Sequence, residues 1–175
     1  MRDDDADPIV RFYRLEGADA RGRLLSDILG WDDNRLESVH DYIQWLFPLP
    51  EPSAFNPFAP ILSEATVRTF QHDASLRARL AQALARMLAF YGLAETTRRG
   101  HVTIEPTPDF PARSRNWLHA GNHNHLRLTR ILTSLRLLGL EDQSRALLAC
   151  LERVAGDHPH AISSTTLAYW KRAVA

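Results

Sequence analysis

Apolar residues recur every three or four positions along most of the chain, which is the spacing of one face of an α-helix. The longest such stripe starts at Leu76 and ends at Tyr91. Asp73 or Ser75 can cap its start, and Gly92 follows it as a left-handed C-terminal residue. These positions predict one long amphipathic helix.

The same pattern predicts several more helices, whose ends are marked by capping residues, glycines or prolines. In chain order they are a short helix after Asp7-Pro8 that stops near Gly17, residues 23–29, a third helix from Asp32 to Phe47, one that begins at Glu64 after Ser63, one from Asn122 or Asn124 to Leu138, residues 142–155, and a last helix capped by Ser163 or Ser164. The third helix stops before Pro48, because a proline disfavours the helical conformation of the preceding residue.

Two stretches break the helical pattern. Residues 48–60 hold five prolines and predict an extended segment. Residues 94–121 predict a long connection, in which the alternating piece 101–104 is typical of a minor hairpin or extended edge. We therefore expect an all-α fold, with a flexible acidic tail at residues 1–7 and a single globular domain of about six to eight helices at residues 8–175.

Composition argues against several classes of protein. Hydrophobic residues make up 45% of the 175 residues, and the formal net charge is zero. Zero net charge argues against a protein that coats nucleic acid or an anionic membrane. No apolar run approaches the roughly 18 residues that span a bilayer, so we expect no transmembrane segment. The single cysteine, Cys150, allows no disulfide within the chain and indicates a reducing, cytoplasmic location.

Residues 40–48 read HDYIQWLFP and carry a family resemblance. They resemble the His-x-Tyr-Ile-Gln-Trp-Leu-Phe-Pro segment of the opioid growth factor receptor conserved region. The Met-Leu-Ala-Phe-Tyr-Gly run at residues 87–92 and the Leu-Arg-Leu-Thr-Arg-Ile-Leu run at residues 126–132 are similar to further motifs of that family, in the same order. The resemblance covers roughly residues 10–172.

The resemblance implies an intracellular receptor for an enkephalin peptide, which in animals is associated with the nucleus and nuclear envelope. Two features set this chain apart, since it lacks the long C-terminal tail of the animal members and 20 of its 21 basic residues are arginine. We therefore expect a short bacterial member, to which the opioid ligand does not carry over. What carries over is a domain and a generic binding role. Our own first hypothesis for the ligand is a peptide or a small anion.

The HDYIQWLFP stretch allows two interpretations. On a continuous helix, His40 and Gln44 lie one turn apart and Trp45 points away from the apolar stripe. In the first interpretation, Trp45 is buried by the proline-rich segment or another helix, and the unusual mixture is architecture. In the second, Trp45 anchors a ligand in a pocket and Gln44 bonds to the polar groups of that ligand.

A second candidate region lies where the helix near residue 124 begins. Arg127 and Arg130 fall in its first turns, and a helix N-terminus with arginines can hold a phosphate or a carboxylate. The same arginines can instead pin the long connection through hydrogen bonds. We expect a ligand site to combine both regions, from the residues His40, Gln44, Trp45, Asn116, Trp117, Asn124, Arg127 and Arg130.

Three histidines, His119, His123 and His125, lie close together in the sequence. No neighbouring carboxylate completes a zinc site, so we expect exposed polar histidines, and neither a metal nor a cofactor. Asn122 or Asn124 then caps the following helix.

No nucleotide-binding loop or familiar hydrolase motif occurs, which favours a binding protein over an enzyme. Two alternatives stay open. One is a motif-poor hydrolase or transferase in which His40 acts as acid–base and Arg127 and Arg130 hold an anionic substrate. The other is a structural interaction domain that acts through a surface patch.

Overall fold

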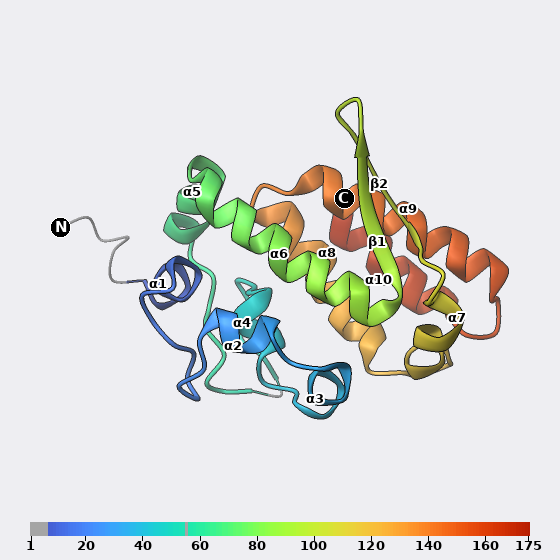
Figure 1. Ribbon diagram of the computed structural model, residues 1–175, viewed down its shortest axis with the longest axis horizontal. Coiled ribbons are helices and arrows are strands. Elements are labelled where there is room, and N and C mark those ends of the chain that lie inside the picture. Colours follow the sequence, from blue (N-terminus) through green and yellow to red (C-terminus); the bar gives the residue numbers. More distant parts are fainter. Residues whose placement is uncertain (1–6, 55) are drawn as a thin grey trace. The chain divides into compact units, whose positions relative to one another are not determined.

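The computed structural model describes residues 7–54 and 56–175 (Figure 1). These residues form ten α-helices and one two-stranded sheet, which confirms the mostly helical fold. The chain divides into two compact units, Met1–Ala83 and Leu84–Ala175. Apart from Asp7, the predicted acidic tail lies outside the described residues, and the single domain at residues 8–175 stays a prediction.

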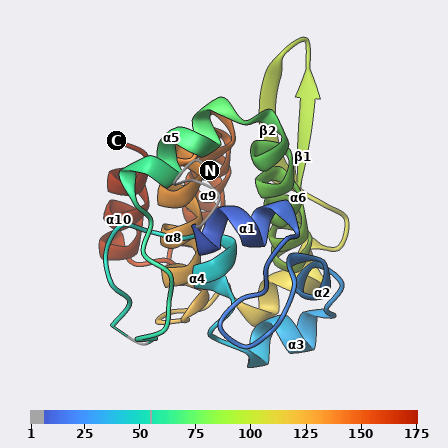
Figure 2. The same cartoon turned by 90° about the vertical axis from the view of Figure 1, so that its left-hand side faces the viewer.

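The first unit contains five helices and most of a sixth. They are α1 (Pro8–Arg14), α2 (Leu25–Leu29), α3 (Asp33–Ser38), α4 (Ile43–Leu46), α5 (Glu64–His72) and α6 (Ala74–Tyr91), which continues into the second unit. Helices α1 and α5 are neighbours (Figure 2). Asp7 links them, because its carboxylate accepts the N–H groups of Ile9 and Val10 at the start of α1 and the hydroxyl of Thr66 in α5.

Capping residues begin the helices where the sequence predicts them. Ser63 Oγ accepts the N–H of Thr66 at 3.1 Å at the start of α5. Asp73 Oδ1 accepts the N–H of Ser75 at 2.9 Å at the start of α6. Each bond satisfies a backbone donor that has no partner inside its helix.

Aromatic side chains fill the core of the first unit. The ring of Phe12 lies 5.7 Å from that of Tyr13 and 5.5 Å from that of Trp45, and Tyr13 lies 5.0 Å from Phe70. The Tyr13 hydroxyl donates a hydrogen bond to the carbonyl of Leu46. Burial raises the pKa of Tyr13, so its phenol stays protonated and keeps this bond.

The continuous helix predicted from Asp32 to Phe47 is wrong. Helix α3 stops after Ser38, because Val39 is extended with φ −96° and ψ 134°. Helical structure resumes only at Ile43, in the short helix α4. The apolar spacing therefore continues across a break in the backbone, and the face assignment made for one long helix does not hold.

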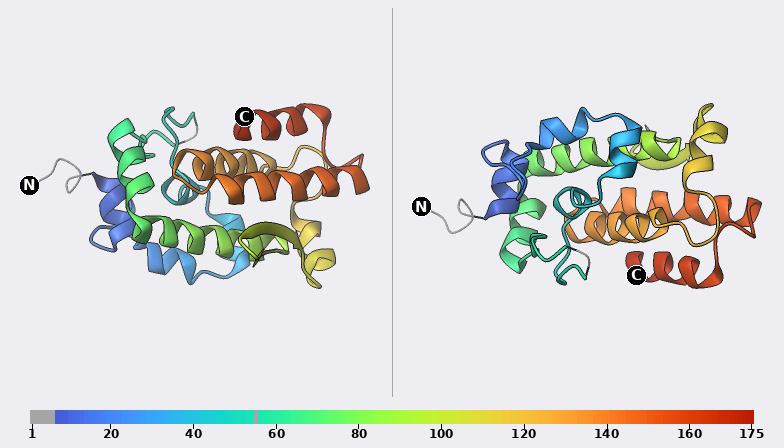
Figure 3. Two further views of the ribbon diagram at one scale, coloured as in Figure 1. Left: turned by 90° about the horizontal axis from the view of Figure 1, so that it is seen from above. Right: turned by 90° about the horizontal axis from the view of Figure 1, so that it is seen from below.

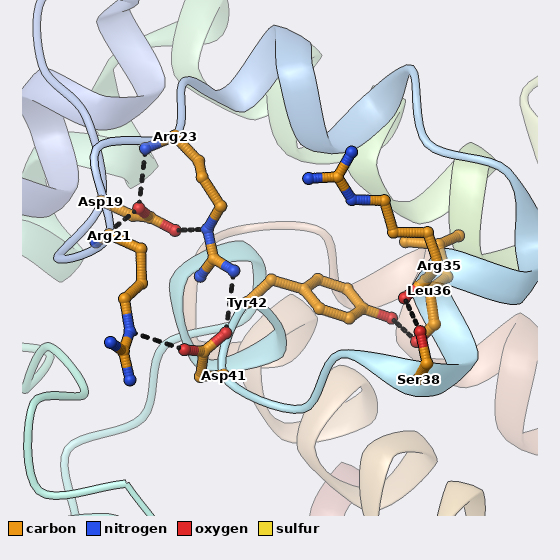
Figure 4. Close-up of polar contacts among 8 residues, drawn as sticks. All are labelled: Asp19, Arg21, Arg23, Arg35, Leu36, Ser38, Asp41 and Tyr42. Carbon is orange, nitrogen blue, oxygen red and sulfur yellow. Dashed lines mark hydrogen bonds and ion pairs between the residues drawn. The ribbon is translucent and has the colours of Figure 1, made fainter.

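Side-chain bonds hold the chain in this broken form (Figure 4). Asp41 lies in the break and accepts hydrogen bonds from Arg23 Nη1 at 2.8 Å and Arg21 Nε at 3.1 Å. The hydroxyl of Tyr42 donates to the carbonyl of Leu36 in α3 at 3.0 Å. Burial by itself raises the pKa of Asp41. The hydrogen bonds and positive charges of Arg23, and next those of Arg21, outweigh burial and hold this pKa below its usual value.

The described residues of the proline-rich segment form no helix, as expected, but the two ends of the segment are joined. Leu49 and Ile61 form a parallel bridge, and the N–H of Leu62 bonds to the carbonyl of Leu49 at 3.0 Å. Between them, the N–H of Ala59 bonds to the carbonyl of Asn56 at 3.1 Å and closes a turn. This bridge holds the segment as a closed loop.

The second unit follows the end of α6. Its elements are β1 (Leu93–Arg98), β2 (His101–Pro106), α7 (Phe110–Arg113), a 3₁₀ helix at Ser114–Asn116, α8 (Asn124–Leu137), α9 (Glu141–Asp157) and α10 (Ser164–Val174). Strands β1 and β2 form an antiparallel hairpin within the long connection, which confirms the extended piece predicted there. Helices α8, α9 and α10 lie side by side (Figure 3).

Helix α8 ends as the glycine pattern predicts. Gly139 has φ +86°, and the N–H of Leu140 bonds to the carbonyl of Leu135 at 2.8 Å. This pair of features is the Schellman motif. The described residues form more helices than the expected six to eight, because the stretch predicted as one helix is split into α3 and α4, and because α7 forms in the long connection.

Candidate functional site

The HDYIQWLFP residues that were expected to line a site differ in exposure. His40 is exposed and precedes α4, whereas Trp45 is 6% exposed and packs against Phe12. Because the backbone is not helical between Ser38 and Ile43, His40 and Gln44 do not share a helical turn. The burial of Trp45 supports the architectural interpretation of this ring.

Gln44 carries the polar anomaly of the first unit. It is 7% exposed, and its Oε1 atom has no hydrogen-bond partner among the described residues. A buried amide oxygen without a partner costs free energy, on the order of 1–3 kcal/mol. The role of Gln44 in hydrogen bonding to the polar groups of a ligand stays a prediction.

Arg23 is the centre of a charged cluster in the same unit (Figure 4). Its Nε bonds to Asp19 at 2.6 Å, and its Nη1 bonds to Asp41 at 2.8 Å. The guanidinium carbons of Arg23 and Arg35 lie 5.4 and 4.3 Å from the centre of the Trp31 ring. These bonds join the loop before α2 to the break before α4, so the cluster has a clear structural role.

Trp117, Asn124 and Arg127 form a buried network in the second unit. All three are at most 5% exposed. Asn124 Oδ1 accepts a hydrogen bond from Arg127 Nη1 at 3.3 Å and one from the Tyr91 hydroxyl at 3.4 Å. The indole N–H of Trp117 donates to the carbonyl of Tyr91 at 3.1 Å. The Trp117 bond ties the end of the long connection to Tyr91, whereas the bond of Arg127 to Asn124 lies within α8, so the role predicted for Arg127 stays a prediction.

His125 extends this network, contrary to the expectation that the three histidines are exposed. It is 5% exposed, and its Nε2 lies 3.0 Å from the carbonyl of Trp117, so this nitrogen carries the proton. Its own carbonyl accepts the indole N–H of Trp170 at 3.1 Å. Burial lowers the pKa of His125, and the nearby charges of His119 and His123 lower it further. His119 and His123 are exposed.

The start of α8 is already bonded to its own loop. The N–H of Asn124 bonds to Asn122 Oδ1 at 2.8 Å, that of His125 to the carbonyl of Asn122, and that of Leu126 to the carbonyl of His123. An anion at this helix N-terminus has to displace these bonds. The carbonyl of Asn116 is likewise bonded, to the Asn122 amide at 3.0 Å.

Arg130 is half-buried and Asn116 is exposed, so these two remain the accessible members of the predicted set in the second unit. His40, Gln44 and Trp45 belong to the first unit and the other five predicted residues to the second. A ligand site that combines both groups therefore stays a prediction.

A hollow of about 430 Å³ lies within the second unit, between β2 and α9. Its lining has an apolar part, formed by Val102, Ile104, Ala146 and Ala149, and a polar part, formed by His101, Thr103, Asp142, Arg145 and Arg153. The lining contains two arginines and a histidine but one carboxylate, so the hollow favours a negatively charged ligand.

Sequence reasoning missed this hollow. The signal was present in α9, where Asp142, Arg145, Ala146, Ala149 and Arg153 recur at helical spacing. The two alanines leave room beside the helix because their side chains end at Cβ. The sequence does not distinguish these arginines from those of an ordinary solvated helix face, since nothing in it shows that β2 lies opposite them.

Cys150 lies on α9 close to this hollow, but it faces the core. Its side chain is completely buried. Burial raises the pKa of Cys150 to about 11, so at neutral pH it is a thiol and not a nucleophilic thiolate.

The described residues show neither a metal centre nor a membrane-spanning helix. Within residues 7–54 and 56–175, no three His, Cys, Asp or Glu side chains are grouped so as to hold a metal ion. Across the same ranges, no helix has the length and apolar character required to cross a bilayer.

Comparison with known proteins places the motifs in context. The model of the family described as "Opioid growth factor receptor (OGFr) conserved region" matches residues 20–175. Over 136 residues the chain is 43% identical to the opioid growth factor receptor of Rattus norvegicus, which covers 75% of this chain and 23% of that protein. Over 138 residues it is 42% identical to the receptor of Homo sapiens, with coverages of 77% and 20%. No solved structure matches the chain.

A second group of relatives is more distant. Opioid growth factor receptor-like protein 1 of Mus musculus is 37% identical over 116 residues, which cover 63% of this chain and 23% of that protein. The chain thus spans about a fifth of the length of the curated relatives that it matches. All of these relatives come from animals, so the comparisons do not support the bacterial origin expected from arginine usage.

Proposed function

Because the chain belongs to the opioid growth factor receptor conserved-region family, we propose that it is a ligand-binding helical domain whose ligand carries negative charge. The ligand class is a peptide or a small anion. The relatives are named receptors, and this name is what suggests binding as the activity.

The hollow between β2 and α9 is the observation that carries this proposal. Its volume of about 430 Å³ falls in the usual range for ligand sites, roughly 300–1,000 Å³. Arg145 is an accessible cation of its lining, with a side chain that is 67% exposed and 3.3 Å from Glu141. A surface ion pair of this kind contributes little to stability, so Arg145 is free to exchange Glu141 for a ligand.

The predicted residues have a different part in this proposal. Trp117, Asn124 and Arg127 are buried. Arg127 donates to Asn124, and the bond of Trp117 to the Tyr91 carbonyl holds the end of the segment between the hairpin and α8. The alternative, in which His40 acts as acid–base and Arg127 and Arg130 hold an anionic substrate, stays a prediction.

Titration calorimetry with succinate and with inorganic phosphate tests the proposal. We expect saturable binding that weakens about tenfold in Arg145→Ala, because a hydrogen bond to a charged group contributes about 1.5–3 kcal/mol. The matched control is Arg68→Ala, since Arg68 also pairs with a glutamate four residues away and has a 64% exposed side chain.

Two results count against the proposal. One is the absence of saturable binding for both anions. The other is an equal loss of affinity in Arg145→Ala and Arg68→Ala, which indicates a general charge effect and not a site at the hollow.

A further inference from the structure

The hairpin turn fixes which backbone groups of β2 are used inside the sheet. Arg99 and Gly100 form a two-residue turn with φ values of 52° and 77°, the signs that a type I′ turn requires. Arg98 and His101 close this turn as a pair that exchanges hydrogen bonds. Since such pairs alternate with unbonded ones, the N–H and C=O groups of Val102 and Ile104 point away from β1.

A side chain of α9 confirms the direction of this edge. Arg153 Nη2 donates a hydrogen bond to the carbonyl of Ile104 at 3.1 Å. The arginine thereby occupies the place that a backbone N–H of a third strand would take. Val102 points its backbone groups to the same side, and it lines the hollow together with Ile104 and Arg153. The hollow therefore contains an open strand edge as well as cations.

The spacing of Arg145 and Arg153 along α9 also matches a spacing between side chains on an extended peptide. From Arg145 to Arg153, α9 rises about 12 Å. Two side chains four residues apart on an extended peptide are about 13 Å apart and lie on the same face of the strand. Carboxylates at such positions can reach the two arginines together.

We propose that the hollow binds an extended acidic peptide segment, which pairs with the open edge of β2 at Val102 and places its carboxylates at Arg145 and Arg153. This inference rests on the proposed function, and it specifies the ligand class for the same site. Backbone pairing with a strand edge is a common way to hold an extended peptide, and pockets or charges beside the edge then select its side chains. The apolar floor of Ala146, Ala149 and Val102 accepts the residue between the acids.

The decisive probe is the blocked pentapeptide Ac-Glu-Thr-Val-Thr-Glu-NH2, which has acids at its first and fifth positions and an apolar side chain between them on the same face. We expect it to bind about tenfold more tightly than succinate, because it adds backbone hydrogen bonds and apolar contact. Methylation of its central amide nitrogens removes those donors, and we expect the affinity to return to that of succinate. Nuclear magnetic resonance should show slower hydrogen exchange at the Val102 N–H with the pentapeptide and no change with succinate.

A filling variant locates the site without touching its charges. Ala149 is exposed, so Ala149→Trp can fill the hollow without entering the core, and we expect it to weaken pentapeptide binding at least about tenfold. Ala168 is also exposed on a helix, in α10, and Ala168→Trp serves as the matched control that leaves binding unchanged.

The outcomes separate the two proposals. If neither succinate nor the pentapeptide binds, the proposed function fails, and this inference fails with it. If succinate binds through Arg145 but the pentapeptide binds no more tightly, only the inference is overturned. Equal affinity of the methylated and unmethylated peptides, or unchanged exchange at Val102, also overturns it.

Discussion

The indole nitrogen of Trp117 donates a hydrogen bond of 3.1 Å to the backbone carbonyl of Tyr91. The two rings meet edge to face with centroids 5.5 Å apart. This contact joins the last residue of α6 to the end of the segment that carries the hairpin and α7. The buried pair of Tyr91 and Trp117 therefore joins the two ends of the segment that carries the hairpin and α7.

Trp117→Phe should lower the free energy of unfolding by about 2–3 kcal/mol, because it leaves the buried Tyr91 carbonyl without its donor and removes part of a packed ring. Urea denaturation followed by far-ultraviolet circular dichroism measures this change. Tyr169→Phe is the control, since Tyr169 is 49% exposed and its loss should cost at most about 0.5 kcal/mol. Equal effects of the two substitutions contradict the structural role of Trp117.

Gly92→Ala should destabilise the fold strongly. Gly92 has φ +78°, and a Cβ built there lies 2.8 Å from the Phe110 Cα and 2.9 Å from the Arg113 Cβ. Gly121→Ala separates backbone strain from steric overlap of the added Cβ. Gly121 has a similar φ of +74°, but an added Cβ there would meet nothing within 4 Å. We expect about 1 kcal/mol for Gly121→Ala and more than about 2 kcal/mol for Gly92→Ala, measured as shifts in thermal unfolding.

His125 should make the fold sensitive to mild acid. Its pKa is lowered in the folded chain by burial, whereas the unfolded chain takes up the proton near pH 6.5. The unfolded state then binds more protons, so the stability linked to His125 is complete above about pH 6.5 and is lost as the pH falls through the folded pKa.

Unfolding free energies between pH 7 and pH 5 measure this effect. His125→Gln should flatten the pH dependence, and a slope equal to that of the unsubstituted protein is the result that rules the linkage out. His160→Gln, at an exposed position, is the matched control and should keep the original slope.

Trp45→Ala should cost about 3–5 kcal/mol, the usual effect of deleting a buried aromatic ring. Trp45 is 6% exposed and packs on Phe12, which makes it part of the core of the first unit. Chemical denaturation checks this value. A loss below about 1 kcal/mol contradicts the core assignment and makes Trp45 a candidate ligand contact again.

The helical fold was predictable because its signals are local. Ser63, Asp73, Gly92 and Gly139 mark helix ends through their own backbone and side-chain chemistry, and the structure confirms each of them. The break at Val39 was not predictable in this way. It depends on hydrogen bonds from Arg21 and Arg23, about twenty residues earlier in the chain, to Asp41.

The candidate site likewise combines features that are local in the sequence with features that depend on contacts between distant residues. The motif residues stand out in the sequence, but their burial depends on what packs against them. Trp117 and Arg127 look like ligand contacts in a sequence, because large polar-tipped side chains serve both binding and internal bonding. The hollow is formed where small alanines of α9 lie opposite β2, and the helical spacing of the α9 residues does not reveal which segment lies opposite them.

The chemistry of Cys150 has a practical consequence for labelling. The chain has one cysteine, and its thiol is buried with a pKa of about 11. A cysteine introduced at an exposed position such as Ala149 will therefore react with maleimide dyes while Cys150 stays unmodified. The natural sequence thus already provides a background on which a single fluorophore can be attached beside the hollow and used to report occupancy directly.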